Sequence, residues 1–247
     1  YIPRSKVLGW RSGEVVVFEN GVTEYKHPVT QAYSKIFYSN CALRGSCYNC
    51  PYTDFNRPGD LTIADYWGIE QKRPDLYQKE GVSMILVNSE KGESFLNSMD
   101  TITLSKTEKN TIIKEKQPHL FYPVKQPDTY EKFWREYKEK GWSYIIKKYA
   151  ECEKFSLNHR RVDRIKDIKP LMGSKYVQSN AFTCFDYVLK DIELGKKVLF
   201  VGTPCQVAAL KKLQDKGKNN LLLVDFVCHG VPSQMLVKEH IRYVESF

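Results

Sequence analysis

The sequence contains no long apolar run. No stretch approaches the roughly eighteen consecutive apolar residues that a membrane-spanning helix needs. The first residues, Tyr1 to Arg4, do not begin the apolar segment that is typical of a signal peptide. We therefore expect no membrane span and a cytoplasmic location. The 247 residues, 42% of them hydrophobic, are enough for one large domain or two modest ones with a buried core.

Several common cofactor signatures are missing as well. The chain has no G-x-G-x-x-G, no Walker A loop, no internal repeat and no second Cys-x-x-Cys beside Cys47 and Cys50. A four-cysteine zinc ribbon and a complete ferredoxin motif are therefore excluded. The cysteine count is seven, and an odd number argues against a closed disulfide framework. Closely spaced cysteines then indicate metal, cluster or redox chemistry.

The chain has a surplus of basic residues, with a formal net charge of +9. Such a balance suits an anionic partner, but the lysines and arginines are scattered through helix-like stretches, where solvated faces explain them equally well. Lysines and aromatic residues alternate in 130–149 without any recognised nucleic-acid-binding motif. We therefore expect no nucleic-acid partner.

Residues 1–104 are predicted to form a β-rich segment that contains the Cys-x-x-Cys pair. Asn20-Gly21 lies between two β-like runs and favours the type I′ turn of a hairpin. The predicted elements of this segment are strands over 14–18, 22–25, 60–68 and 83–87 and a helix over 93–99. Residues 105–155 are predicted to be a polar linker over 105–127 and a helix over 129–149, whose apolar side is typical of core.

Residues 156–247 alternate between helical and strand patterns. The predicted elements are helices over 185–194, 206–213 and 233–243 and strands over 197–201 and 221–226. Continuous apolar strands separated by helices indicate a mostly parallel sheet. The sequence thus predicts an α/β fold, with a mostly parallel sheet covered by helices and an added β-rich segment that contains cysteines.

Two cysteines follow the predicted parallel strands, at the edge of the sheet where α/β proteins bind ligands. Cys205 ends the run Gly-Thr-Pro-Cys, and Cys228 begins Cys-His-Gly. Thr203 is suited to cap the next helix and Pro204 to occupy its first turn. The positive end of that helix would favour a Cys205 thiolate, which could ligate a metal. The alternative is that both cysteines are small buried packing residues.

The Cys47-x-x-Cys50 pair suits two ligands of one metal ion or cluster, and Pro51 follows it as in ferredoxin-type runs. Such a site must recruit distant ligands. Cys205 and Cys228 are the main candidates and Cys41 is the reserve. The remaining cysteines, which have no partner nearby in the sequence, are interpreted as structural: Cys152 and Cys184.

A glycine-serine-lysine turn, Gly173-Ser174-Lys175, offers hydroxyl groups and a cation that could hold a phosphate or the edge of a flavin. His229 could be a proton donor beside a redox centre. A histidine that is bonded into a turn is the alternative interpretation of His229.

Five blocks of the sequence together resemble the beta-subunit family of coenzyme F420 hydrogenases and dehydrogenases, mainly its C-terminal domain. The blocks are 173–179, 198–210, 225–233, 47–52 and 59–68. The resemblance implies FAD and a 4Fe–4S cluster, and electron transfer between a hydride carrier such as coenzyme F420 and a redox partner protein or substrate. It implies a flavin near Lys175, Thr203 and His229. It also implies cluster ligands among Cys47, Cys50, Cys205 and Cys228.

The blocks occur in circularly permuted order, because those after residue 156 come first in the family. The resemblance shows no N-terminal ferredoxin module, and most of the segment that precedes the Gly173 block in the family is absent. We expect a flavin- and iron–sulfur-dependent oxidoreductase or redox subunit, and leave a homo-oligomer open. The alternative is an accessory protein of polysaccharide biosynthesis, with a structural metal or none.

Overall fold

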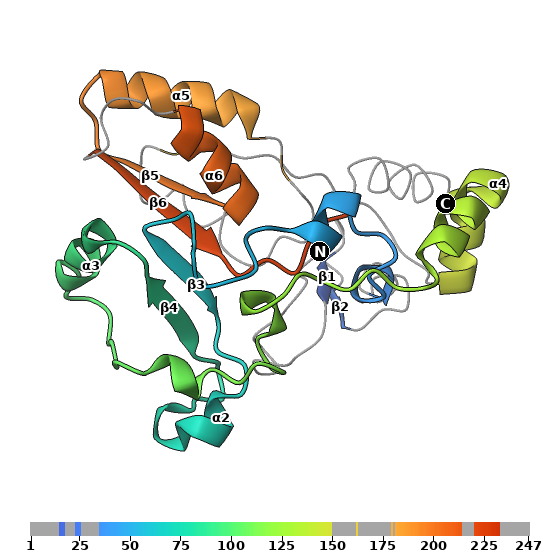
Figure 1. Cartoon of the computed structure of the whole chain (residues 1–247), viewed down its shortest axis with the longest axis horizontal. Helices are drawn as coiled ribbons and strands as arrows, with labels where there is room; N and C mark the ends of the chain where they lie inside the picture. The colour runs from blue at the N-terminus through green and yellow to red at the C-terminus, as the bar shows by residue number, and fades with distance from the viewer. Residues whose placement is uncertain are drawn as a thin grey trace. The chain divides into compact units, whose positions relative to one another are not determined.

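The computed structural model describes residues 15–17, 23–25, 35–149, 162, 179, 181–213 and 220–232 (Figure 1). The chain divides into two compact units, each assembled from segments that are far apart in the sequence. The first unit comprises Tyr1–Asn49, Val124–Asn180 and Gly230–Phe247. The second unit comprises Cys50–Pro123 and Ala181–His229.

The second unit is built on a four-stranded sheet with the strand order β4-β3-β6-β5. Its strands are β3 (Leu61–Asp65), β4 (Ser83–Val87), β5 (Val198–Gly202) and β6 (Leu221–Phe226). The central strand β6 pairs in parallel with both β3 and β5, whereas β4 pairs antiparallel with β3. The predicted α/β class and the mostly parallel sheet are therefore confirmed.

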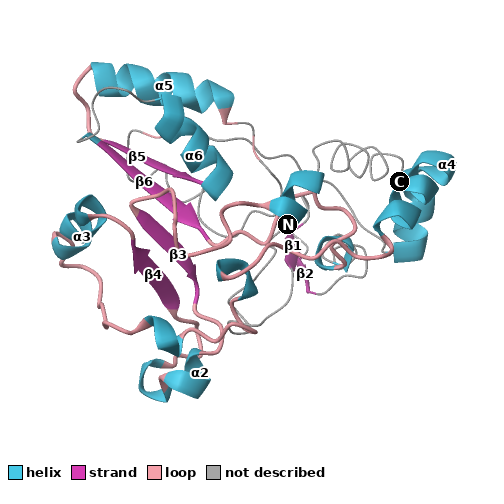
Figure 2. Cartoon of the chain, in the orientation of Figure 1, coloured by secondary structure: helices cyan, strands magenta, loops and turns pink. Residues whose placement is uncertain are grey.

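Helices pack on both faces of this sheet (Figure 2). The helices of the second unit are α2 (Ile69–Lys72), α3 (Glu90–Asn97), α5 (Phe182–Glu193) and α6 (Pro204–Leu213). On one face, Phe185 of α5 and Leu210 of α6 pack with Phe200 and Leu223 of the strands. On the other face, Leu96 of α3 joins the cluster of Leu61 and Val224.

The ends of these helices follow from their sequences. Ser89 begins α3 by accepting a hydrogen bond from the Gly92 N–H at 3.1 Å, so the helix starts earlier than the predicted residue 93. Gly195 has a positive φ of 71° and follows α5, which confirms the predicted glycine stop. α6 begins at Pro204 rather than at residue 206, since proline fits a first helical turn.

The first unit contains a small hairpin and a long helical segment. β1 (Val15–Val17) pairs antiparallel with β2 (Thr23–Tyr25), as predicted, although the Asn-Gly turn lies outside the described residues. α4 (Tyr130–Tyr149) departs from the continuous helix expected over 129–149, because Gly141 takes φ 75° and ψ 176° and breaks it. Phe133 and Ile145 are fully buried on its inner side, so the predicted core stripe is confirmed.

The predicted linker over 105–127 is less irregular than expected. It holds the short 3-10 helices η4 (Lys109–Thr111) and η5 (Pro118–Leu120). Two further 3-10 turns are η2 (Gly45–Asn49) and η3 (Pro74–Leu76). Leu120 of η5 is fully buried against Tyr66 and Ile69, so this end of the predicted linker is part of the core of the second unit. The predicted helix over 233–243 lies outside the described residues.

Candidate functional site

Three parallel strands of the second unit end at the same edge of the sheet. Gly202 of β5 lies opposite Asp225 of β6, and Ile63 of β3 lies opposite Phe226 of β6. The chain leaves β5 toward Cys205 and leaves β6 toward Cys228. The sequence predicted these two strand ends, and the structure adds the carboxyl end of β3 beside them. This edge is where an α/β sheet binds ligands.

Cys205 is the second residue of α6, and its side chain is exposed. The Gln206 side-chain oxygen accepts hydrogen bonds from both the Thr203 N–H and the Thr203 hydroxyl, each at 3.0 Å. The Thr203 hydroxyl also lies 3.1 Å from the Cys205 sulfur. The first turn of α6 thus has a fixed conformation around an accessible thiol, and Pro204 lies buried between Thr203 and Cys205.

Exposure separates the cysteines into two groups. Cys205 is exposed, and Cys47, Cys50 and Cys228 are half-buried. The other two described cysteines are buried, and the sequence assigned them to reserve and structural roles: Cys41 and Cys184. Accessible thiols are the ones that can reach a metal or a cluster.

The two enclosed cysteines have structural surroundings. The sulfur of Cys41 lies 3.2 Å from the Thr129 hydroxyl inside the core of the first unit. Burial raises the pKa of the Cys184 thiol above its usual value, which disfavours a thiolate. Cys152 lies outside the described residues.

Cys47 lies in η2 of the first unit and contacts the segment that follows Gly230. The backbone N–H of Val231 donates a hydrogen bond to the Cys47 sulfur at 3.4 Å. Gly230 has φ 120°, and a Cβ atom at this position would lie 3.2 Å from the Cβ of Cys47 and 3.0 Å from Leu43. Glycine is therefore needed here for the close approach. The Cys47 thiol in turn donates to the Val231 carbonyl at 3.9 Å.

His229 forms a pair with His119, a residue that the sequence analysis did not select. Nδ1 of His229 lies 2.8 Å from Nε2 of His119, and the two rings meet edge to face with centroids 4.6 Å apart. Burial and, second, the charge interaction with His119 lower the pKa of His229 to about 4. Burial also lowers the pKa of His119 below its usual value. Both rings are therefore neutral near pH 7.

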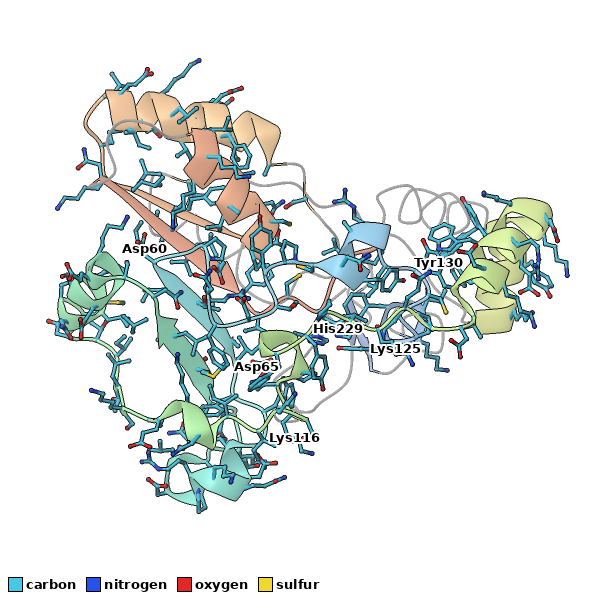
Figure 3. The ribbon with its side chains drawn as sticks, viewed as in Figure 1. Asp60, Asp65, Lys116, Lys125, Tyr130 and His229 are labelled. Atoms are coloured by element: carbon cyan, nitrogen blue, oxygen red, sulfur yellow. The ribbon has the colours of Figure 1, made fainter. Side chains whose placement is uncertain are left out.

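The position of His119 depends on contacts between η5 and the end of β3. The side-chain amide of Gln117 donates a hydrogen bond to the backbone carbonyl of Asp65, the last residue of β3. Gly68, with φ 88°, allows Lys116 to approach the following turn, because a Cβ there would lie 2.9 Å from the Lys116 Cγ. Figure 3 labels Asp65, Lys116 and His229 around this part of the chain. No sequence pattern indicated His119, since it lies in a polar stretch without periodicity.

A buried ion pair, also not predicted, lies beside the same edge. Nη2 of Arg57 lies 2.8 Å from Oδ1 of Asp225, and both side chains are completely excluded from solvent. Arg57 also donates to the backbone carbonyls of Tyr52 and Phe226. Asp225 accepts further hydrogen bonds from the Gly59 N–H and the Thr62 hydroxyl. Arg57 thus joins the segment that follows Cys50 to the end of β6, two residues before Cys228.

Gly173, Ser174 and Lys175 lie outside the described residues. Within the described ranges, no three or more His, Cys, Asp and Glu side chains are grouped in a way that would hold a metal ion. No helix in the described part of the chain is long and apolar enough to cross a membrane.

Comparison with known proteins assigns the family. The profile that describes the C terminus of the coenzyme F420 hydrogenase/dehydrogenase beta subunit matches residues 6–112 and 195–246, more than half of the chain. The chain belongs to this family. The beta-subunit family indicates a redox role, as the sequence predicted. No curated protein and no solved structure matches the chain.

The two matched parts of the beta-subunit family profile contribute to one sheet. β3 and β4 come from the first matched part, and β5 and β6 come from the second. β3 pairs in parallel with β6, so the two parts meet along a continuous ladder of backbone hydrogen bonds. The permuted order of the blocks stays a prediction.

Proposed function

We propose that this chain is a flavin- and iron–sulfur-dependent redox subunit that moves electrons between a hydride carrier like coenzyme F420 and a partner protein or substrate. Membership of the beta-subunit family supports a redox role and a partner. The observation that carries the finer proposal is the pair of accessible cysteines, Cys205 and Cys228, that follow neighbouring carboxyl ends of β5 and β6. The proposal includes a cytoplasmic setting, in which thiols stay reduced.

The proposed ligands of a 4Fe–4S cluster are Cys47, Cys50, Cys205 and Cys228. Their exposure supports this choice over the enclosed cysteines. The Val231 N–H that donates to the Cys47 sulfur suits the tuning of a cluster potential. A bound cluster would supply single-electron transfer and FAD would supply hydride transfer.

The proposed flavin contacts are Gly173, Ser174, Lys175, Thr203 and Pro204. Thr203 and Pro204 lie at the start of α6, where the backbone N–H groups of the residues that follow them suit a phosphate. His229 is the proposed catalytic residue, because it follows β6 at the same edge of the sheet and its pairing with His119 holds one side of its ring. Its proposed role is to stabilise charge on the group that accepts the hydride.

The test is anaerobic purification followed by visible absorption spectroscopy and by iron, zinc and flavin analysis. We expect about four irons per chain and broad visible absorption that bleaches on reduction. Cys205→Ser should lower the iron content, whereas the matched control Cys184→Ser should leave it unchanged, because Cys184 is enclosed in the core. Equal iron content in the two variants would remove Cys205 from the ligand set.

A colourless protein without iron and flavin, even after reconstitution under reducing conditions, would contradict the proposal. Stoichiometric zinc without visible absorption would instead favour an accessory protein with a structural metal. The two results are separated by metal analysis of the same sample.

A further inference from the structure

We infer that an exposed group of aromatic and lysine side chains on the second unit is the docking surface for an acidic redox protein. This lysine–aromatic surface consists of Phe55, Lys109, Lys114, Phe121 and Tyr122. The inference rests on the proposed function for the purpose of docking, which is electron exchange with the partner. The surface itself is formed by the chain alone and needs no bound cofactor.

The side chains of the lysine–aromatic surface form one continuous group. Phe55 and Phe121 pack edge to face, with ring centroids 5.4 Å apart. Nζ of Lys114 lies over two rings, 5.7 Å from the centroid of Phe121 and 5.3 Å from that of Tyr122. Nζ of Lys109 lies 5.0 Å from the centroid of Phe55. Cation–π contacts therefore position both ammonium groups over the rings, which lowers the entropy that they would lose on binding.

The aromatic rings of this surface are open to solvent. Phe121 is 36% exposed and Tyr122 is 43% exposed. Single exposed apolar residues are common on proteins, but these two are neighbours that also contact a third ring through Phe55. Aromatic side chains are enriched at protein interfaces, where they contribute much of the binding free energy. The exposed rings therefore favour a protein partner.

The charge of the surface indicates the kind of partner. Lys109 and Lys114 are exposed, and neither forms an ion pair with a carboxylate in the described part of the chain. Other lysines of the second unit do form ion pairs, for example Lys91 with Asp60 at 2.9 Å. Residues 105–122 contain four lysines and two glutamates, so the segment has a surplus of positive charge. A partner with an acidic surface would supply the matching carboxylates.

The position of the surface in the second unit indicates a redox partner. Phe121 directly follows η5 and lies two residues after His119, whose ring contacts that of His229. The chain that carries the surface therefore packs against the segment that leaves the carboxyl end of β6. A protein that docks there would lie near Cys228, a proposed cluster ligand. Electron-transfer complexes are small and transient, and complementary charge speeds their association.

Single-stranded nucleic acid also binds surfaces of aromatic and basic side chains, by stacking its bases on open ring faces. In the lysine–aromatic surface, ammonium groups lie over the rings of Phe55, Phe121 and Tyr122. Stacked bases would have to displace these groups, whereas carboxylates of a partner could contact them from outside. The geometry therefore favours an acidic protein over a nucleic acid.

The test measures binding of the whole chain to two purified acidic redox proteins, a 2Fe–2S ferredoxin and a flavodoxin, by biolayer interferometry. We expect binding at low salt that weakens as the salt concentration rises, because salt screens exposed charges. The double variant Lys109→Gln/Lys114→Gln should bind about fivefold more weakly at low salt. The matched control is Lys197→Gln/Lys212→Gln, which removes the same charge from exposed lysines before β5 and in the last turn of α6. It should change the affinity by less than about twofold.

A second variant tests the aromatic part of the surface. Phe121→Ser/Tyr122→Ser should weaken binding at every salt concentration, because it removes apolar contacts and no charge. Circular dichroism would verify that all variants are folded. Equal affinities of the lysine double variant and its control would overturn the inference, and so would a lack of binding to both acidic proteins at low salt. Binding of oligothymidylate alone, lost in the lysine double variant, would overturn it in favour of a nucleic-acid surface.

Flavin and iron are measured in the same preparations, so the two proposals fail separately. If the acidic proteins bind through the lysine–aromatic surface of a chain that holds neither cofactor, only the proposed function fails. If both cofactors are present and the lysine double variant binds like its control, only the docking surface fails.

Discussion

Replacing Arg57 with methionine should strongly destabilise the second unit. The substitution keeps an unbranched apolar side chain but removes both contacts to Oδ1 of Asp225, from Nε at 3.2 Å and from Nη2 at 2.8 Å. Asp225 would keep two hydrogen bonds, from the Gly59 N–H and the Thr62 hydroxyl, but would have no counter-charge. It would remain buried, because its side chain is fully excluded from solvent.

The magnitude follows from burial. Removing one partner of a buried ion pair costs about 3–5 kcal/mol of unfolding free energy, since an uncompensated charge is left inside the protein. The backbone carbonyls of Tyr52 and Phe226 also lose their donor. For a chain of this size, such a loss corresponds to a decrease in melting temperature of roughly 6–20 °C.

The assay combines thermal melting with peptide-resolved hydrogen exchange, because exchange shows which segments of the chain lose stability. Faster exchange should appear in β3 and β6 of Arg57→Met. The matched control is Arg73→Met, which removes an ion pair of similar length, 2.7 Å to Asp75, whose side chains are 30% and 58% exposed. Surface pairs of this kind contribute little, so we expect no measurable change in melting temperature.

Two results would refute the reasoning. One is a melting temperature for Arg57→Met that does not differ from that of Arg73→Met. The other is a melting temperature for the double variant Arg57→Met/Asp225→Asn that is as low as that of Arg57→Met alone. Removing the unpaired charge should restore part of the lost stability, because an amide oxygen in the place of Oδ2 could still accept from the Gly59 N–H, and the amide N–H in the place of Oδ1 could donate to the Thr62 hydroxyl oxygen.

Two further predictions concern individual side chains. In the apoprotein at pH 8, an alkylating reagent should modify Cys205 well before Cys184, because Cys205 is exposed and burial raises the pKa of the Cys184 thiol. Mass spectrometry of the labelled peptides measures both rates, and equal rates would contradict this prediction. Burial opposes ionisation of Asp60, but hydrogen bonds from the Leu223 N–H, Lys91 and Ser89 outweigh it and lower its pKa below 3.8. The stability that this carboxylate contributes is present above pH 3.8 and is lost as the pH falls through the pKa that Asp60 has in the folded protein. In urea titrations, the free energy of unfolding of Asp60→Asn should therefore decrease less with falling pH than that of the unsubstituted protein.

Local patterns in the sequence were sufficient to predict most elements of the fold. Apolar runs indicated β5 and β6, the spacing of Phe133 and Ile145 indicated the buried side of α4, and Gly195 marked the end of α5. Where an observed helix end differs from the predicted one, a specific local contact sets it, such as the Ser89 cap of α3. The break at Gly141 was missed because apolar periodicity continues through it.

The missed features of the candidate site depend on long-range pairing. β3 is a short strand that could join any sheet, and only its ladder with β6 places its end beside Cys205 and Cys228. Arg57 and Asp225 are 168 positions apart, and His119 and His229 are 110 positions apart. Neither pair has a local signature, because each residue alone resembles an ordinary surface side chain. The candidate cysteines could be selected from the sequence, because thiols are typical metal ligands and because these cysteines lie in a Cys-x-x-Cys pair or directly after a predicted strand.

The long-range ladder between β3 and β6 also has a consequence for protein synthesis. Thr62 and Asp225, which lie opposite each other, are 163 residues apart. On the ribosome, β3 and β4 therefore emerge long before the central strand, and the edge of β3 that β6 will cover stays unpaired for that time. Such an edge invites pairing with other chains. Nascent-chain folding should thus be late and cooperative, with the sheet of the second unit forming only when β6 has left the exit tunnel.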